Sequence, residues 1–346
     1  MRIFKRFFKD VEILKIKTKQ KIFFLLILFI FMVLIPLAAV RKNKNNTLEA
    51  VSLNKSQSIA PHKNFLHKHS NFTVLDEHTN KTLKIPEKEM VFSATAAEMP
   101  AMFENEAIKA QAIASYTYFC HLKNTKPKKQ KYDFKINSQK CMNFISEEQM
   151  RKNWGTRFDE YYEKIKNNVE NVFPLKIMYE DSPIFAAYHA ISSGITEKSS
   201  DVFGGSLPYL TNVESPGDKF AKGYETKVSF SKEEFQKILA DNNFKINLQD
   251  NLEKLVNNYE RTPGGGVKNI LIGSHKIKGT DIRSFFNLRS SNFTIDYSPQ
   301  ENKFTVTTLG YGHGVGMSQC GANYMAKQGK NYEEILTHYY PGTKLI

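Results

Sequence analysis

An uninterrupted apolar segment, Ile22–Val40, constrains the layout of this chain more than any other feature, because it contains no charged residue. At about 1.5 Å per residue, a helix of this length spans roughly 28 Å, enough to cross the hydrocarbon core of a bilayer. Eight Lys and Arg residues precede the segment, and three follow it closely. This positive-inside bias predicts a cytoplasmic tail over 1–21, a single transmembrane helix over 22–40 and an extracytoplasmic remainder.

A cleaved signal peptide is the alternative for the same segment, because Leu37-Ala38-Ala39 offers a small-residue cleavage site. Its apolar core would be unusually long, so a retained anchor is favoured. Residues 41–71, rich in Asn, Lys, Ser and His, are expected to form a tether without a core-forming pattern. Residues 72–346 are then long enough for one domain with its own hydrophobic core.

The net charge of +14 is concentrated at the N-terminus. Residues 1–44 contain eleven Lys and Arg against two acidic residues, whereas the rest of the chain contains 38 against 33. Most of the basicity therefore flanks the apolar segment, and no basic face with interleaved aromatics stands out elsewhere. This distribution argues against a nucleic-acid partner. The three cysteines are too few for a disulfide framework, and their odd number leaves at least one unpaired within the chain.

Helical and strand patterns are mixed along residues 72–346. The alternating stretch 72–85 predicts a hairpin with its turn at 77–80, and Pro86 is expected to open a helix that runs to Glu98. Further helices are predicted over about 104–122, 147–153, 156–171, 231–242, 251–259, 318–328 and 332–339. Strands are predicted within 174–188, 267–287, 291–299 and 303–316, and a loop over 124–140. This order predicts an α+β fold, a single mixed catalytic domain with a groove.

One glutamate, Glu98, stands in the apolar stretch AAEMPA at 96–101. Pro100 moves the residue before it out of the helical conformation, so the helix is expected to end near Glu98. Poor solvation and the negative end of the helix dipole both raise the pKa of a carboxyl placed there. Such a carboxyl suits a general acid that holds its proton near neutral pH. The alternative is an ordinary polar residue at a helix end.

The glycine-rich stretch GYGHGVGMSQCGA, at 310–322, is a second candidate. Alternating glycines let the backbone approach a ligand closely. His313 is expected to project from this loop, and Ser318 to open the next helix. The stretch lacks the lysine of a phosphate-binding P-loop and the context of a dinucleotide fingerprint, so neither is predicted. A purely structural strand-to-helix turn is the alternative.

The third candidate is the turn YHAISSGITE at 188–197. A histidine, serines, a threonine and an acid on one turn can hydrogen-bond a hydroxyl-rich ligand. A lone histidine after a strand can equally be structural. The candidate ligand-binding residues here are His189, Ser192, Ser193, Thr196 and Glu197.

Together the three segments resemble the catalytic domain of the SpoIID family, the stage II sporulation protein D family of lytic transglycosylases. The motifs that carry the resemblance are AAEMPAMFENEAIKAQAIASYTY, YHAISSGITE with Asp201 following, and YGHGVGMSQCGAN. The resemblance extends from about Ile85 to the C-terminus, and the anchor and tether suit the same layout.

The resemblance implies a bacterial enzyme that cleaves the MurNAc–GlcNAc bond of peptidoglycan and leaves a 1,6-anhydro-MurNAc end. Its substrate would be glycan strands already stripped of their peptides by the amidase SpoIIP, and the membrane protein SpoIIM is a further implied partner. The implied role is septal wall remodelling and engulfment during sporulation, with the domain facing the septal wall from the mother-cell membrane. No cofactor is expected.

By the same resemblance, Glu98 matches the catalytic glutamate of the family, and Lys109 matches another position of its groove. A transglycosylase needs only one such acid, because the sugar's own C6 hydroxyl attacks C1, whereas hydrolytic glycosidases usually need two carboxyls. Glu98 is therefore expected to protonate the leaving oxygen and to deprotonate that hydroxyl. The other expected substrate-binding residues are His189, Ser192, Ser193, Thr196, Glu197, His313, Ser318, Gln319 and Cys320.

The chain departs from the family pattern at two places. Tyr116 stands where relatives often have an arginine, so any electrostatic role of that arginine is absent or moved. Some relatives carry a Cys-x4-His-Cys zinc cluster in the loop after that helix, where this chain keeps only Cys141, with Lys140 and Lys135 at the expected His and Cys positions. A tetrahedral zinc site needs four ligands, so no metal is predicted there.

Two other classes of function remain open. Cys320 lies just after a helix start, and with His189 or His313 as its base it would make a Cys–His cell-wall peptidase or amidase. A noncatalytic glycan-binding module that recruits an amidase is the other class. Alkylation of the thiol tests the first class, and the absence of anhydro-sugar products would support the second.

Overall fold

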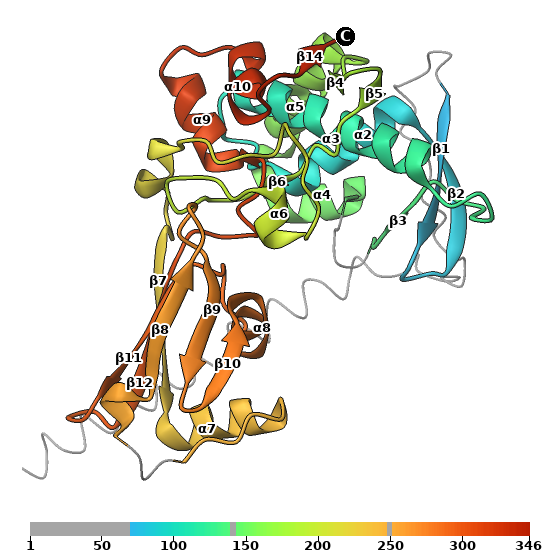
Figure 1. The fold of residues 1–346 in the computed structure, drawn as a ribbon. Coiled ribbons are helices and arrows are strands. Elements are labelled where there is room, and N and C mark those ends of the chain that lie inside the picture. Colours follow the sequence, from blue (N-terminus) through green and yellow to red (C-terminus); the bar gives the residue numbers. More distant parts are fainter. Residues whose placement is uncertain (1–69, 139–142, 248–250) are drawn as a thin grey trace, which may run out of the picture. The chain divides into compact units, whose positions relative to one another are not determined.

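The computed structural model describes residues 70–346 except 139–142 and 248–250, and these residues belong to one compact unit (Figure 1). Helices and strands are mixed within it, which confirms the predicted α+β class. The predicted transmembrane helix and nearly all of the tether lie outside the described residues. Among the described residues, no helix has the length and apolar character needed to cross a membrane.

The predicted hairpin is present as β1 (Asn71–Asp76) and β2 (Lys81–Pro86), which pair antiparallel with Val74 opposite Leu83. Its turn contains Asn80 at a φ of 53°, a left-handed conformation that asparagine tolerates well. A third strand, β3 (Phe134–Ile136), pairs parallel with β1. The prediction of a loop over 124–140 was therefore wrong at these three residues, because pairing with a distant strand leaves no local signal.

Helix α2 (Glu87–Glu98) follows Pro86 and ends where predicted, since Met99 is extended with φ −110° and ψ 128°. Helix α3 (Asn105–Thr125) is the central helix and contacts α2, α5, α9 and α10. Close packing is possible because its small residues are fully buried, namely Ala107, Ala110 and Ala114. The other helices packed around it are α5 (Phe158–Val172), α9 (Gln319–Lys327) and α10 (Tyr332–Tyr339), and α4 (Glu147–Trp154) contacts α5.

Residues 225–309 form a β lobe with its own hydrophobic core (Figure 1). Phe235 and Phe304 stack at the centre of this core, with ring centroids 4.1 Å apart. One antiparallel sheet has the order β11-β12-β7 and the other the order β10-β9-β8. Their strands are β7 (Glu225–Ser231), β8 (Val256–Arg261), β9 (Val267–Ile272), β10 (His275–Lys278), β11 (Phe293–Ser298) and β12 (Lys303–Leu309). Helices α7 (Lys232–Asp241) and α8 (Gly279–Phe285) accompany them.

Two sequence predictions fail in the β lobe. The run 251–259, expected to be helical, contains one 3-10 turn, η3 (Leu252–Lys254), and then strand β8. A run of nine residues with mixed polarity fits both the helical period and the alternation of a strand. Antiparallel pairing with β9 makes it a strand. Helix α8 also interrupts the stretch 267–287, for which only strands were predicted.

The remaining elements of the described residues are short. They are η1 (Gly155–Arg157), β4 (Ile177–Tyr179), β5 (Ser182–Pro183), β6 (Tyr188–His189), α6 (Ser199–Val202), η2 (Pro216–Phe220), β13 (Met317–Ser318) and β14 (Lys344–Leu345). Two of them matter most for function, because β6 and β13 carry residues of the turn motif and of the glycine-rich motif.

Candidate active site

Strands β6 and β13 bring together two motifs that lie about 130 residues apart in the sequence. They pair in parallel, with His189 opposite Ser318. Glu197 also forms an isolated bridge with Val315. Gly316 has a φ of 73°, and a Cβ built there would lie 2.0 Å from the carbonyl oxygen of Ala187. The glycine-rich stretch thus permits a backbone contact that a side chain would prevent.

Gln319 joins the glycine-rich motif to the glutamate motif. It is the first residue of α9, which Ser318 caps by accepting a hydrogen bond from the Gly321 amide. Its side-chain Nε2 donates to the backbone oxygen of Glu98 at 3.0 Å and to Oε1 of Gln111 at 3.2 Å. The end of α2 is therefore held by a buried amide network, which places Glu98 relative to α9.

The Glu98 carboxyl is half-buried, and burial raises its pKa above the ordinary glutamate value. A backbone hydrogen bond from Asn143 opposes this effect only in part. Burial raises the pKa of Tyr188, and the Glu98 charge adds to this effect, so the Tyr188 phenol keeps its proton. Both the helix end and the direction of the Glu98 pKa shift agree with the prediction from the sequence.

Neighbouring residues of β6 point to opposite sides, as strand geometry requires. Tyr188 interacts with Glu98, whereas the ring of His189 lies 5.8 Å from that of His313. His189 Nδ1 donates to the carbonyl oxygen of Val315 at 3.2 Å, and His313 Nδ1 accepts from the Val315 amide at 3.0 Å. Burial lowers the pKa of His189 to about 3 and that of His313 to about 4. Both imidazoles are therefore neutral at neutral pH.

Asp218, in η2, organises the loop between the two motifs. Its carboxylate accepts hydrogen bonds from the backbone and hydroxyl of Ser192, and from the hydroxyl of Ser318 at 2.7 Å. All three side chains are buried. Thr196 is also buried, and its hydroxyl bonds the backbone of residues 211 and 213. The hydroxyls of Ser192, Thr196 and Ser318 thus support the shape of the loop from inside.

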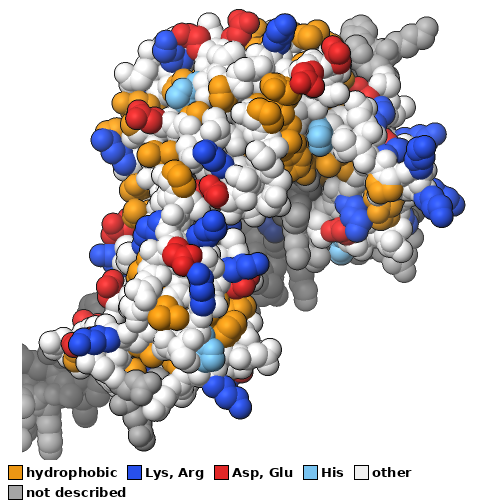
Figure 2. Space-filling model, viewed as in Figure 1, with side chains coloured by type: hydrophobic (Ala, Val, Ile, Leu, Met, Phe, Trp, Pro, Cys, Tyr) orange, Lys and Arg blue, Asp and Glu red, His pale blue; other side chains and the backbone are white. Residues whose placement is uncertain are grey.

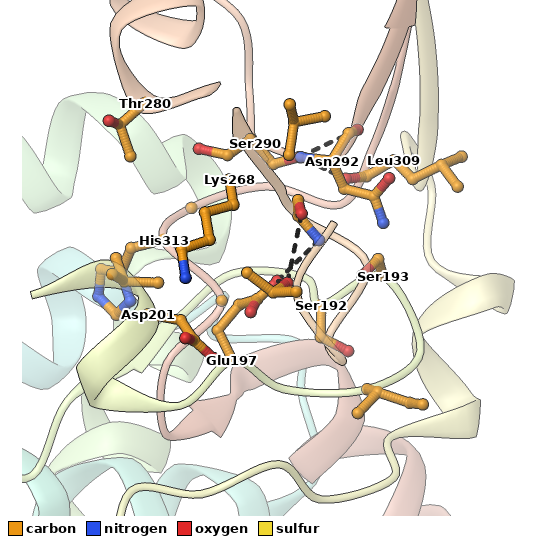
Figure 3. A pocket seen from close by; sticks show the side chains of 18 of the residues that line it. Ser192, Ser193, Glu197, Asp201, Lys268, Thr280, Ser290, Asn292, Leu309 and His313 are labelled. Carbon is orange, nitrogen blue, oxygen red and sulfur yellow. Dashed lines mark hydrogen bonds between the residues drawn. The ribbon is translucent and has the colours of Figure 1, made fainter. Parts of the chain in front are cut away.

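A pocket of about 370 Å³ opens beside the turn motif (Figure 3). Its wall includes Ser193, Glu197 and His313 from the motifs that the sequence singled out. The turn between β8 and β9 closes another side: Glu197 Oε1 accepts from Thr262 Oγ1 and from the Gly266 amide, both at 2.9 Å. The Ser193 hydroxyl donates to the carbonyl oxygen of residue 264 at 2.7 Å.

Seven residues predicted for the site do not line this pocket, namely Glu98, Lys109, His189, Thr196, Ser318, Gln319 and Cys320. Lys109 Nζ bonds Glu106 Oε1 at 2.7 Å and lies 5.9 Å from the ring centre of Tyr332. The structure thus gives two neighbouring regions, the end of α2 around Glu98 and the pocket around Glu197, with β6 between them.

Several residues of this arrangement were missed by sequence reasoning. The buried Gln111 and the partly buried Tyr188 interact with the Glu98 region, and Asp218 and Lys268 lie outside all three motifs. Gln111 could have been found, since a glutamine inside an alanine-rich, buried helix face needs a hydrogen-bond partner. Asp218 and Lys268 have no comparable local signal.

The positions that depart from the family pattern have partners of their own. Tyr116 donates to Glu87 at the opposite end of α2 from Glu98, at 2.8 Å, and Lys123 pairs with the same carboxylate at 3.0 Å. Lys135 pairs with Glu77 at 3.2 Å, while Lys140 and Cys141 lie outside the described residues. Within the described part of the chain, no cluster of three or more His, Cys, Asp or Glu could hold a metal ion.

Charges of both signs are interspersed over the face drawn in Figure 2, without a continuous basic surface. Many of these charges are ion-paired, as in Lys276–Glu260 at 2.6 Å.

Comparisons with known proteins place these motifs in one family. The SpoIID family model, described as stage II sporulation protein, matches residues 76–179. The chain is 37% identical to stage II sporulation protein D of Bacillus amyloliquefaciens and 35% identical to that of Bacillus subtilis (strain 168), each over 75% of this chain and 74% of the relative. It is 24% identical to a B. subtilis protein named amidase enhancer, over 72% of this chain and 39% of that protein. With its three motifs assembled around β6, β13 and the end of α2, this chain belongs to the SpoIID family of stage II sporulation proteins.

Proposed function

We propose that this chain is a peptidoglycan lytic transglycosylase in which Glu98 is the single acid and base. The observation that carries the proposal is the Glu98 carboxyl itself: half-buried, with its pKa raised by burial, and held at the end of α2 by Gln319. A carboxyl that keeps its proton near neutral pH can donate it to a leaving oxygen.

The reaction needs two proton transfers, one from Glu98 to the substrate and one from the substrate back to Glu98. Glu98 donates its proton to the glycosidic oxygen as the bond from MurNAc C1 to that oxygen breaks. The C6 hydroxyl of the same MurNAc attacks C1, and the Glu98 carboxylate takes up the hydroxyl proton. The products are a free GlcNAc 4-hydroxyl and a 1,6-anhydro-MurNAc end, and no water is consumed.

The surroundings of Glu98 favour this route over hydrolysis. A retaining hydrolase places its two carboxyls about 5–5.5 Å apart, where like charges shift each other's pKa. Among the described residues, the Glu98 pKa responds only to burial and to the Asn143 hydrogen bond, and to no second carboxyl. An internal hydroxyl nucleophile fits a site with one acid.

The Cys–His alternative lacks the electrostatics that it requires. Burial raises the pKa of the Cys320 thiol to about 11, whereas the pKa values of His189 and His313 are lowered to about 3 and 4. A nucleophilic cysteine needs a lowered pKa or a histidine able to take its proton. Neither condition is present at Cys320.

The similarity to a protein named amidase enhancer supports a second candidate, a glycan-binding protein that assists an amidase. The two functions differ in product. A transglycosylase releases anhydro-muramic ends from purified strands, whereas a noncatalytic module binds the strands and releases none.

The layout proposed for the whole protein follows the sequence. The segment Ile22–Val40 anchors the chain in the mother-cell membrane, and residues after it face the septal wall during engulfment. The partners are peptide-stripped glycan strands, the amidase SpoIIP that produces them, and the membrane protein SpoIIM.

Substitution of Glu98 tests the reaction. Glu98→Gln keeps the size of the side chain but removes its transferable proton, so release of anhydro-muramic products should fall by about 10²–10⁴-fold. Mass spectrometry of digests of peptide-free strands measures the products, and binding of the same strands should persist. Glu104→Gln is the matched control, because this exposed carboxyl lies six residues away and should be dispensable. Undiminished release by Glu98→Gln would exclude Glu98 as the acid.

A further inference from the structure

The pocket beside Glu197 contains a buried carboxyl oxygen without a partner. Glu197 is 7% exposed, and Oε1 takes both of the carboxyl's hydrogen bonds, from Thr262 and Gly266. Oε2 is buried and has no hydrogen-bond partner among the described residues. An unsatisfied buried carboxyl oxygen costs free energy, so one that persists in a pocket wall points to a ligand that donates a hydrogen bond there.

A lysine enters the same pocket from the β lobe. Lys268, on β9, extends toward the side of the pocket that holds His313 and Asp201 (Figure 3). Its charge helps to lower the pKa of Glu260, but among the described residues it makes no hydrogen bond or ion pair. By contrast Lys276, on the neighbouring strand, pairs with Glu260 at 2.6 Å. An ammonium group that the protein leaves unpaired beside a polar pocket is suited to an anionic group of a ligand.

The balance of charges in the pocket limits what the ligand can be. Its wall holds two acids, Glu197 and Asp201, and two lysines, Lys268 and Lys278. The two acids repel a dianion such as phosphate more strongly than a monoanion, and the two lysines repel an amine. The remaining wall is rich in serine, threonine and asparagine, which suits hydroxyl and amide groups with a single carboxylate.

We propose that this pocket binds a muramic acid residue whose lactyl carboxylate is free, with Lys268 pairing with that carboxylate and Glu197 Oε2 accepting from a hydroxyl or amide N–H of the same residue. The inference rests on the proposed function, and adds to it a site that selects the substrate. GlcNAc has no carboxylate, and muramic acid that still carries a peptide holds this group as an amide. The pocket therefore distinguishes stripped strands from intact ones.

The position of the pocket suits a polymer. Tyr188 of β6 interacts with Glu98, whereas the next residue, His189, faces His313 in the pocket wall. The selecting pocket and the catalytic carboxyl are thus served by two successive residues of one strand.

Binding measurements test the site apart from catalysis. Full-length chain carrying Glu98→Gln is titrated with peptide-free glycan strands, and with the same strands after conversion of their lactyl carboxylates to methylamides. Strands with free carboxylates should bind about tenfold more tightly than the methylamide strands, because one charge-assisted hydrogen bond contributes about that much to affinity. Lys268→Met should remove this preference, while the control Lys276→Met should keep it. Glu197→Gln retains the Oε1 contacts but places an NH₂ at the Oε2 position, so it should weaken the binding of both kinds of strand.

Each outcome decides between specific claims. Equal affinity for the two kinds of strand, or a preference that survives Lys268→Met, would overturn the role of Lys268. Unchanged binding by Glu197→Gln would overturn the role of Oε2. A carboxylate preference together with no anhydro product from the unmodified chain would refute the proposed reaction while keeping the binding site. Anhydro product without any carboxylate preference would refute the site alone.

Discussion

Glu98 behaves as it does because it ends a helix in a poorly solvated place. Burial raises its pKa, whereas burial lowers the pKa values of the two motif histidines, His189 and His313, to about 3 and 4, so both are neutral at neutral pH. The proposed acid must be protonated to act. Its activity should therefore persist above the ordinary range of a glutamate and then be lost as the pH rises through the raised pKa.

A pH profile of kcat/KM on peptide-free strands checks this expectation. Because the pKa values of His189 and His313 are lowered to about 3 and 4, neither histidine produces an alkaline limb. Such a limb reports a carboxyl with a raised pKa, and Glu98 is the one proposed to transfer the proton. A rate that stays constant well into the alkaline range would contradict the assignment of Glu98 as the proton donor.

At the scale of elements, the site depends on a contact between η2 and two distant segments. Asp218 accepts from Ser192 and Ser318, and so connects the turn motif to the start of α9. Asp218→Ala leaves three buried donors without their acceptor, so it should lower the free energy of unfolding by about 2–5 kcal/mol. Denaturant unfolding measures the loss.

Two comparisons make the Asp218 experiment specific. Asp218→Asn keeps the volume and one acceptor oxygen, and should cost less than the alanine variant. Asp181→Asn changes an exposed carboxyl in the turn between β4 and β5, and should change stability by no more than about 0.5 kcal/mol. Equal stability of Asp218→Ala and the unmodified chain would show that the buried network does not hold the loop.

For the whole molecule, the proposed anchor predicts where the domain is found. The full chain should remain with membranes after alkaline extraction, because a span of this apolar length is not released by breaking electrostatic contacts. Protease added outside intact cells should digest residues after the anchor and leave the basic N-terminus protected. Immunoblotting for the N-terminus and the C-terminus of the chain measures both membrane retention and protease protection. A domain protected from external protease would reverse the proposed orientation, and a soluble domain cut near residue 39 would favour the signal-peptide alternative.

Much of the fold was predictable from local chemistry. Pro86 and Pro100 set the start and the end of α2 through their effect on backbone angles, and Ser231 caps α7 through its hydroxyl. The alternation of apolar and polar residues indicated β1 and β2. These signals act over a few residues, so they can be read directly. The run 251–259 shows their limit, because a short run of mixed polarity becomes a strand only when β9 lies beside it.

The sequence by itself determined the α+β class, the end of α2 and the poorly solvated carboxyl of Glu98, because each depends on neighbours within one or two helical turns. Only the tertiary structure decided which residues share a site. Asp218 accepts a hydrogen bond from Ser318 across 100 positions, and Lys268 of the β lobe lines the same pocket as Glu197. Contacts of this kind follow from strand pairing and core packing over the whole domain, and no local pattern encodes them.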